Sequence, residues 1–323
     1  MSAGVVLEAV VDAGGAAVPR LMERIESRMA ALAGAHGSAL ARYAGNTISA
    51  GGKRLRPLLV CLAAGAPPPE TEGLVRAAVA VELVHGATLV HDDVLDGALL
   101  RRGRPTVIAA AGRELATATG DLLFSRAFAE LAEAGSIGAV RSLSRASMEL
   151  ARGELMQRAD AWSSDVSVER YLERCRLKTA VLFRAACELG ALQGAGRRES
   201  LAVFGEQIGL AFQILDDVLD VSGPPERTGK PRGADLLDGT VTLPLIIARA
   251  RDPELARVEI RAIKGPDDAV AICERIAATG ALAAAKQRAL ELVGVARSAI
   301  PAVSRRQRAA LELLADGVVE RYA

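Results

Sequence analysis

The apolar residues of this chain recur with the period of an α-helix along almost its whole length, and this pattern restricts the fold more than any other feature. Residues 70–96 are apolar on nearly every side, which predicts a helix buried at the centre of the protein. Alternating β-branched patterns typical of strands are missing, so we expect an all-α protein. Further helices are predicted at about 20–35, 53–65, 107–134, 136–160, 167–193 and 197–222, with shorter ones towards the end.

Glycine and proline mark the expected ends of these helices. They occur at Gly51-Gly52, in 66–69 and within the polar stretch 222–233. No change in composition and no repeat of fixed period divides the chain. We therefore expect one helical domain over residues 1–323.

The charge balance excludes several classes of partner. Forty basic and 39 acidic residues give a net charge of +1, whereas a nucleic-acid or anionic-membrane surface requires a basic excess. Aromatic residues make up only 3%, too few for stacking single-stranded nucleic acid. Four scattered cysteines, no signal-peptide pattern and apolar runs broken by charges predict a cytoplasmic protein without a membrane span.

The pentapeptide DDVLD occurs twice, at 92–96 and 216–220, each time near the end of a predicted helix. Residues four apart share a helix face, so the first and last aspartates of each copy point the same way. Carboxylate oxygens are ligands that Mg²⁺ prefers, usually together with substrate phosphates. A single copy would fit a solvated helix end equally well, but two identical copies favour a metal site.

Basic segments accompany the acidic ones. Each alone would fit a solvated surface, but their placement beside the DDVLD copies predicts diphosphate binding. His85 lies about two turns before Asp92 on one face, where a core histidine is equally plausible, and Gln213 precedes Asp216 by three residues. The basic segments are GGKRLRP at 51–57, RRGRPT at 101–106, Lys178-Thr179 and GKP at 229–231.

In their order and spacing over residues 51–244, these motifs resemble the trans-isoprenyl (polyprenyl) diphosphate synthases. The resemblance implies a helical bundle around a central cavity, a homodimer, and Mg²⁺-dependent condensation of isopentenyl diphosphate with an allylic diphosphate. Thr240 departs from the family, which often carries lysine there, and this weakens one possible phosphate contact. The motifs are GGKRLRP, ELVHGATLVHDDVLD, RRGRPT, GDLLFSRAF, GELMQ, KTAVLF, FQILDDVLD, GKPRGADL and TLPLI.

The resemblance also implies roles for individual residues. The metal ligands would be Asp92, Asp96 and Asp216, supported by Asp93, Asp217 and Asp220. The allylic diphosphate would be held by Arg101, Lys178, Thr179, Gln213 and Lys230. Isopentenyl diphosphate would be held by Lys53, Arg56, His85 and Arg102. The residues expected to act directly in catalysis are Asp92, Asp96, Asp216, Arg101, Lys178 and Lys230.

Small residues precede the first aspartate motif by one to three turns and would line a tunnel for the growing chain. A bulky aromatic there stops growth early in the family, so their small size predicts a medium to long product. We expect the tunnel floor at Phe124 or Phe128. The lining residues are Ala87, Thr88, Val84, Val81 and Ala80.

Two other functions remain open from the sequence. A class I terpene cyclase also ionises a metal-bound diphosphate, but it would leave GGKRLRP and RRGRPT unexplained. A non-catalytic subunit that modulates a partner synthase usually loses one aspartate motif, whereas both are whole here. The sequence fixes neither the primer nor the exact product length.

Overall fold

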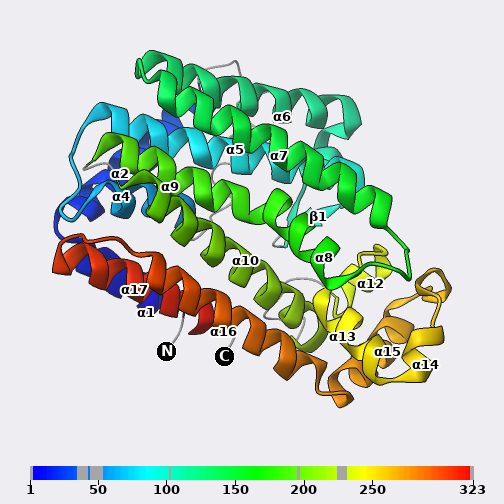
Figure 1. The fold of residues 1–323 in the computed structure, drawn as a ribbon. Helices are drawn as coiled ribbons and strands as arrows, with labels where there is room; N and C mark the ends of the chain where they lie inside the picture. Colours follow the sequence, from blue (N-terminus) through cyan, green and yellow to red (C-terminus); the bar gives the residue numbers. More distant parts are fainter. Residues whose placement is uncertain are drawn as a thin grey trace. The chain divides into compact units, whose positions relative to one another are not determined.

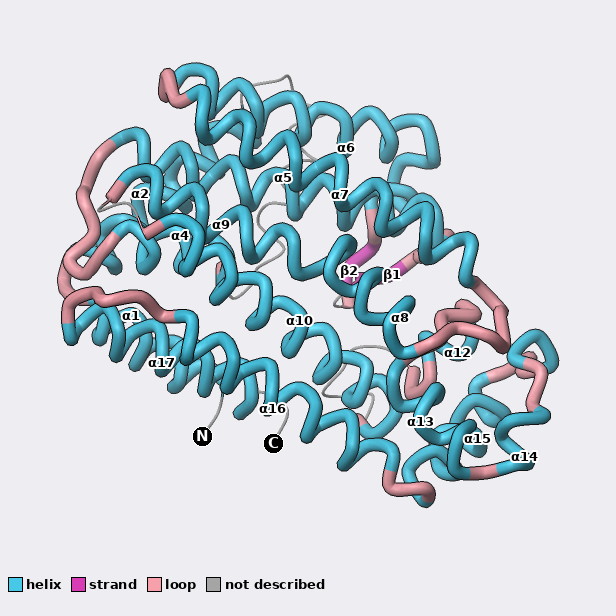
Figure 2. Tube along the Cα trace, in the orientation of Figure 1, coloured by secondary structure: helices cyan, strands magenta, loops and turns pink. Residues whose placement is uncertain are grey.

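The computed structural model describes residues 3–34, 43, 54–101, 103–194, 197–223 and 231–320. Its regular structure is helical except for one two-stranded hairpin (Figures 1 and 2). The chain divides into two compact units. The first unit contains Met1–Ser147, Leu182–Gly205 and Ala299–Gly317. The second unit contains Met148–Val181, Glu206–Ser298 and Val318–Ala323.

The first unit holds the N-terminal helices and the hairpin. Strands β1 (Leu100–Arg101) and β2 (Arg104–Pro105) are antiparallel, with Leu100 opposite Pro105. Its complete helices are α1 (Ala3–Gly14), α2 (Ala17–Gly34), α4 (Leu55–Ala64), α5 (Glu72–Asp96) and α6 (Val107–Glu133). It also contains parts of α7 (Ile137–Asp160), α9 (Val181–Gln193), α10 (Arg198–Ser222) and α17 (Arg305–Glu320).

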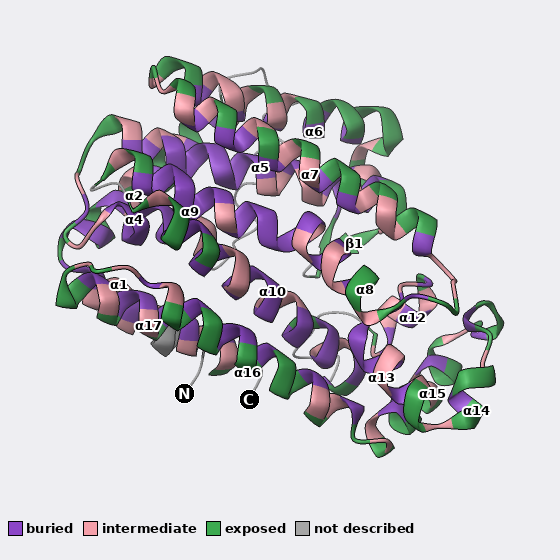
Figure 3. Ribbon diagram, in the orientation of Figure 1, coloured by how far each residue is buried: buried purple, intermediate pink, exposed green. Residues whose placement is uncertain are grey.

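Helix α5 forms the core of the first unit. It packs along α6 and also contacts α4 and α2, and its apolar residues are buried along most of its length (Figure 3). Thr71 caps its first turn by accepting a hydrogen bond from the Leu74 N–H at 3.2 Å. By length and composition α5 is the one described helix that could cross a membrane, but 67% of its most apolar window is buried, as in a core helix.

The second unit holds the shorter C-terminal helices. Within it, α13 contacts α8, α14 and α15, and α12 contacts α15. Besides parts of α7, α9, α10 and α17, it contains α8 (Val168–Cys175), a π-helical turn (Arg176–Ala180), α12 (Ala234–Leu237), α13 (Leu243–Arg251), α14 (Pro253–Arg257), a 3₁₀ turn (Ile260–Ala262), α15 (Pro266–Ala278) and all but the last residue of α16 (Ala281–Ala299).

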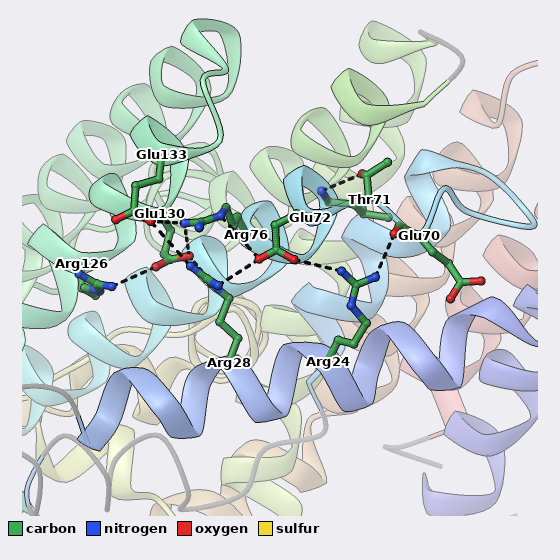
Figure 4. Close-up of polar contacts among 10 residues, drawn as sticks. Arg24, Arg28, Glu70, Thr71, Glu72, Arg76, Arg126, Glu130 and Glu133 are labelled. Atoms are coloured by element: carbon green, nitrogen blue, oxygen red, sulfur yellow. Dashed lines mark hydrogen bonds and ion pairs between the residues drawn. The ribbon is translucent and has the colours of Figure 1, made fainter.

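A charged cluster ties α2, α5 and α6 together in the first unit (Figure 4). Its centre is the fully buried carboxylate of Glu130 on α6. Arg28 of α2 donates to it at 2.5 Å and Arg76 of α5 at 3.2 Å, and Arg126 lies 3.5 Å away. The hydrogen bond to Glu130 is the largest cause of the raised pKa of Arg28. Paired charges of this kind satisfy a carboxylate that burial alone would make costly.

The predicted all-α class is confirmed, and the predicted helices agree with the observed ones to within a few residues. Three features were not predicted. The first is α1, the second is the hairpin, and the third is the π-helical turn between α8 and α9. Helix α6 also bends at Gly112, whose φ of 83° lies in the region that favours glycine. The expectation of a single domain over 1–323 stays a prediction.

Candidate functional site

The first DDVLD copy occupies the last turn of α5. Gly97 ends this helix in the left-handed conformation, with its N–H donating to the Asp93 carbonyl. The copy therefore projects from the end of a helix whose apolar residues are buried along most of its length. Asp92 is half-buried, Asp96 is exposed and Asp93 is buried.

The buried Asp93 is held by the hairpin that follows. Arg101 of β1 donates to Asp93 Oδ1 from Nε at 2.8 Å, and its Nη2 lies 2.7 Å from the same oxygen. The hairpin itself is fixed by Thr106, whose hydroxyl donates to the Ala98 carbonyl at 2.6 Å. Arg101, expected to hold a diphosphate, thus also anchors the aspartate motif to the hairpin.

The second copy, in the second unit, lies at the end of α10 and repeats this pattern. Asp216 is exposed, Asp220 is half-buried and Asp217 is buried. Asp217 accepts hydrogen bonds from the Tyr171 hydroxyl at 2.6 Å and from Gln213 Nε2 at 2.7 Å. Both of its carboxylate oxygens are therefore bound by protein groups.

The electrostatic setting of Asp217 follows from this burial. Removal from water, and next the neighbouring carboxylate of Asp235, raise the pKa of Asp217 to about 8. The hydrogen bonds from Tyr171 and Gln213 act in the opposite direction. Burial, together with the charge of Asp217, also raises the pKa of Tyr171 well above its usual value, which keeps its hydroxyl as a donor.

In each DDVLD copy the middle aspartate is buried, and the first and last are half-buried or exposed. Of these, Asp220 also accepts a hydrogen bond from the Asp235 N–H at 3.2 Å. Asp93 and Asp217, expected to support the metal ligands, have hydrogen-bond partners inside their own units, and their role in metal binding stays a prediction. Within the described part of the chain, no group of three or more His, Cys, Asp or Glu side chains is arranged to hold a metal ion by itself.

A hydrogen-bonded chain joins the second copy to the KTAVLF segment. The Thr179 hydroxyl donates to Gln213 Oε1 at 2.6 Å, and the Gln213 amide continues to Asp217. Both residues were expected to hold the allylic diphosphate, and the structure brings them together beside the motif. Lys178, next to Thr179, lies in the π-helical turn.

Lys178 is oriented by the GELMQ segment of α7. Its ammonium lies 2.5 Å from Glu154 Oε2, and Arg158 donates to the other oxygen of this carboxylate at 2.7 Å. Burial would raise the pKa of Glu154, but the neighbouring cations, Lys178 foremost, hold it below its usual value. A methyl group at Gly153 would lie 2.6 Å from the Lys178 backbone nitrogen, so glycine permits this close approach.

Two arginines of the GGKRLRP segment make different contacts in the first unit. The Arg56 guanidinium lies 4.6 Å from the centroid of the Phe183 ring, in a cation–π contact. Arg54, which the sequence analysis did not select, pairs with Glu26 at 2.5 Å and with the buried Glu82 at 2.9 Å. His85, on the same unit's α5, is half-buried.

The residues expected to line the tunnel also lie on α5. Ala87, Val84, Val81 and Ala80 are fully buried, and Thr88 is half-buried with its hydroxyl donating to the His85 carbonyl at 2.8 Å. Phe124 stacks on His91, which directly precedes Asp92. This placement puts Phe124 near the motif end of α5, and Phe128 lies one turn further along α6. The tunnel and its floor stay a prediction.

The chain matches a known protein family. A family model described as "Polyprenyl synthetase" matches residues 38–278. The chain belongs to this family. It is therefore a prenyltransferase whose chemistry is the elongation of prenyl chains.

Individual relatives of this polyprenyl synthetase carry names with different product lengths. It is 45% identical over 228 residues to heptaprenyl diphosphate synthase component 2 of Geobacillus stearothermophilus, covering 69% of this chain and 70% of that protein. It is 35% identical over 296 residues to a short chain isoprenyl diphosphate synthase of Methanothermobacter thermautotrophicus, covering 87% and 90%.

A solved structure shares the fold over nearly the whole length. The polyprenyl synthase from Caulobacter crescentus, complexed with calcium and isoprenyl diphosphate, superposes with a TM-score of 0.88 at 36% identity, covering 98% of both chains.

Three of the predicted site residues of this polyprenyl synthetase lie outside the described residues: Lys53, Arg102 and Lys230. Sequence reasoning missed Glu154 and Tyr171, which contact Lys178 and Asp217. It also missed Arg54, which pairs with Glu26 and Glu82. Arg54 and Glu154 stand inside two motifs that the sequence analysis recognised, GGKRLRP and GELMQ. The sequence did not show which residues they contact. Tyr171 stands in none of the motifs, and no sequence signal pointed to it.

Proposed function

We propose that this polyprenyl synthetase condenses an allylic diphosphate with isopentenyl diphosphate, giving a longer all-trans polyprenyl diphosphate of medium to long chain and free diphosphate. The observation that carries the proposal is the repeated arrangement of the DDVLD copies, each with a buried middle aspartate bound by the protein and two less buried aspartates beside it. A homodimer in the cytoplasm is part of the same proposal.

The proposed cofactor is Mg²⁺, and the donors fit it. Asp92, Asp96, Asp216 and Asp220 offer hard oxygen ligands four residues apart on helix ends, and Mg²⁺ is usually bound by one or two carboxylates together with phosphate oxygens. When bound, Mg²⁺ would offset the negative charge that grows on the departing diphosphate. The metal-and-diphosphate complex named for the Caulobacter relative supports this assignment.

Side chains of the protein would bind the two diphosphate substrates. Lys178, Thr179 and Gln213 would bind and orient the allylic diphosphate, because Glu154 and the hydrogen-bonded chain to Asp217 fix their positions. Arg101 would bind diphosphate oxygens with the N–H groups that Asp93 does not use. Arg56 and His85 would bind isopentenyl diphosphate. Lys53, Arg102 and Lys230 keep the roles that the family resemblance implies.

The test is a product profile with Mg²⁺, labelled isopentenyl diphosphate and geranyl, farnesyl or geranylgeranyl diphosphate as primer. Longer prenyl diphosphates are expected, and they should disappear when EDTA removes the metal. Formation of hydrocarbons or alcohols from a primer alone would identify a terpene cyclase instead. If the folded protein elongates no primer, the remaining hypothesis is a non-catalytic subunit that modulates a partner synthase. The Geobacillus relative is named "component 2", which is why the test includes this outcome.

Replacing Thr88 by tyrosine should shorten the product by one or more isoprene units. Thr88 is half-buried on the helix that carries the first motif, so a ring there would obstruct the growing chain, whereas fully buried Ala87 would be overpacked by the same change. Chromatography of dephosphorylated products gives the lengths. Thr88→Val, which keeps the volume, should leave the profile unchanged, and an unaltered profile in Thr88→Tyr would remove Thr88 from the tunnel.

Replacing Phe183 by leucine should raise KM for isopentenyl diphosphate about fivefold with little change in kcat. The ring of Phe183 lies under the Arg56 guanidinium, and a cation–π contact of about 1 kcal/mol corresponds to that factor. Steady-state kinetics with each substrate varied in turn measures it. Phe204→Leu is the matched control, since Phe204 is an equally buried ring in the same unit. An equal rise in KM for the allylic primer would contradict the assignment of Arg56.

A further inference from the structure

The GDLLFSRAF segment of α6 contacts the residue that directly precedes the first DDVLD copy. The ring of His91 stacks on Phe124, with ring centroids 5.7 Å apart and an angle of 21° between the planes. Both residues belong to the first unit, where α5 and α6 pack along each other. None of the roles assigned so far uses His91, Gly120 or Asp121.

The polar edge of the same ring is also held by α6. Nε2 of His91 lies 3.3 Å from Asp121 Oδ1 and 3.4 Å from the Thr117 carbonyl oxygen. The ring occupies the space that a side chain at position 120 would need, because a methyl group at Gly120 would lie 2.3 Å from Nε2. Gly120, Asp121 and Phe124 of this segment therefore form the binding pocket of the His91 ring.

His91 is adjacent to Asp92, one of the proposed metal ligands, on helix α5. Successive residues of an α-helix are separated by about 100° around the axis, so His91 and Asp93 project on opposite sides of Asp92. Asp93 is held on its side by Arg101 of the hairpin. His91 is held on the other side by α6. Two lateral attachments thus restrict rotation of the turn from which Asp92 projects.

We propose that His91, seated by Gly120, Asp121 and Phe124, is a positioning residue that aims the Asp92 and Asp96 carboxylates at the metal–diphosphate complex. The proposal rests on the proposed function of these aspartates. Second-layer contacts of this kind influence metal affinity because they fix the direction of the ligands before the ion binds.

The test measures metal binding separately from turnover. Binding of Mn²⁺, a paramagnetic substitute for Mg²⁺, is followed by electron paramagnetic resonance in the presence of inorganic diphosphate. His91→Ala and Gly120→Ala should each weaken Mn²⁺ binding by about tenfold or more. His91→Gln, whose amide N–H still reaches towards Asp121, should recover threefold or more of the loss. Gly294→Ala is the matched control, because this helical glycine has open space around it.

The outcomes separate this proposal from the proposed function. Weakened Mn²⁺ binding in both variants, with recovery by glutamine and unfolding midpoints close to the wild type, supports the positioning role. Mn²⁺ affinity within twofold of the wild type in either His91→Ala or Gly120→Ala overturns it, even if the enzyme elongates primers normally. A wild-type protein that binds no Mn²⁺ with diphosphate instead refutes the metal site itself, and with it the proposed function.

Discussion

Replacing Asp92 by alanine should lower the rate of chain elongation on the order of a thousandfold. Asp92 is an accessible carboxylate of the first DDVLD copy, whereas its neighbour Asp93 is buried against Arg101. Loss of a metal ligand removes several kcal/mol of stabilisation from a transition state in which charge grows on the departing diphosphate. Single-turnover incorporation of labelled isopentenyl diphosphate at saturating primer and Mg²⁺ measures the effect.

Two controls sharpen this result. Asp267→Ala removes an exposed carboxylate from the first turn of α15 and should leave the rate within twofold of the wild type. Asp216→Ala should match Asp92→Ala, because Asp216 is exposed in the second copy. A loss of less than tenfold in Asp92→Ala, in protein that unfolds at the wild-type midpoint, would show that Asp92 does not bind the metal.

Replacing Glu130 by glutamine should lower the free energy of unfolding by about 3 kcal/mol, near the lower end of the range for breaking a buried charged cluster. Glu130 is 0% exposed, and Arg28, Arg76 and Arg126 contact it from three directions. The change leaves their positive charges without the central carboxylate, although partial exposure of the arginines limits the cost. Urea unfolding followed by circular dichroism measures it.

The neighbouring Glu133 provides the comparison. Its side chain is 49% exposed and pairs with Arg76 at the edge of the same cluster. Glu133→Gln should cost far less than Glu130→Gln, as exposed ion pairs contribute little. An equal loss of unfolding free energy in the two variants would show that the burial of Glu130 does not determine how much the cluster stabilises the fold.

The helices followed from the sequence because helix formation depends on neighbours three and four residues away. The apolar run at 70–96 located α5. The same local argument placed both DDVLD copies at helix ends with two aspartates on one face. Helix α1 was missed, and the π-helical turn was not signalled by any local pattern.

The division of labour within the motifs was decided by tertiary structure. The two DDVLD copies are identical in sequence, yet Arg101 binds the buried aspartate of one copy and Tyr171 and Gln213 that of the other. Tyr171 lies 46 positions from Asp217, and no periodic pattern encodes a contact over that separation.

The cations show the same limit. Arg54 and Arg56 stand two positions apart in one motif, but Arg54 pairs with Glu82 while Arg56 lies over Phe183. By itself the sequence determined most of the helices, the resemblance to the family and which residue types could bind a metal or a diphosphate. Only the packing of distant segments decided which of those groups is buried and bound by the protein and which stays accessible, because burial and hydrogen bonding depend on neighbours that the chain brings together only when it folds.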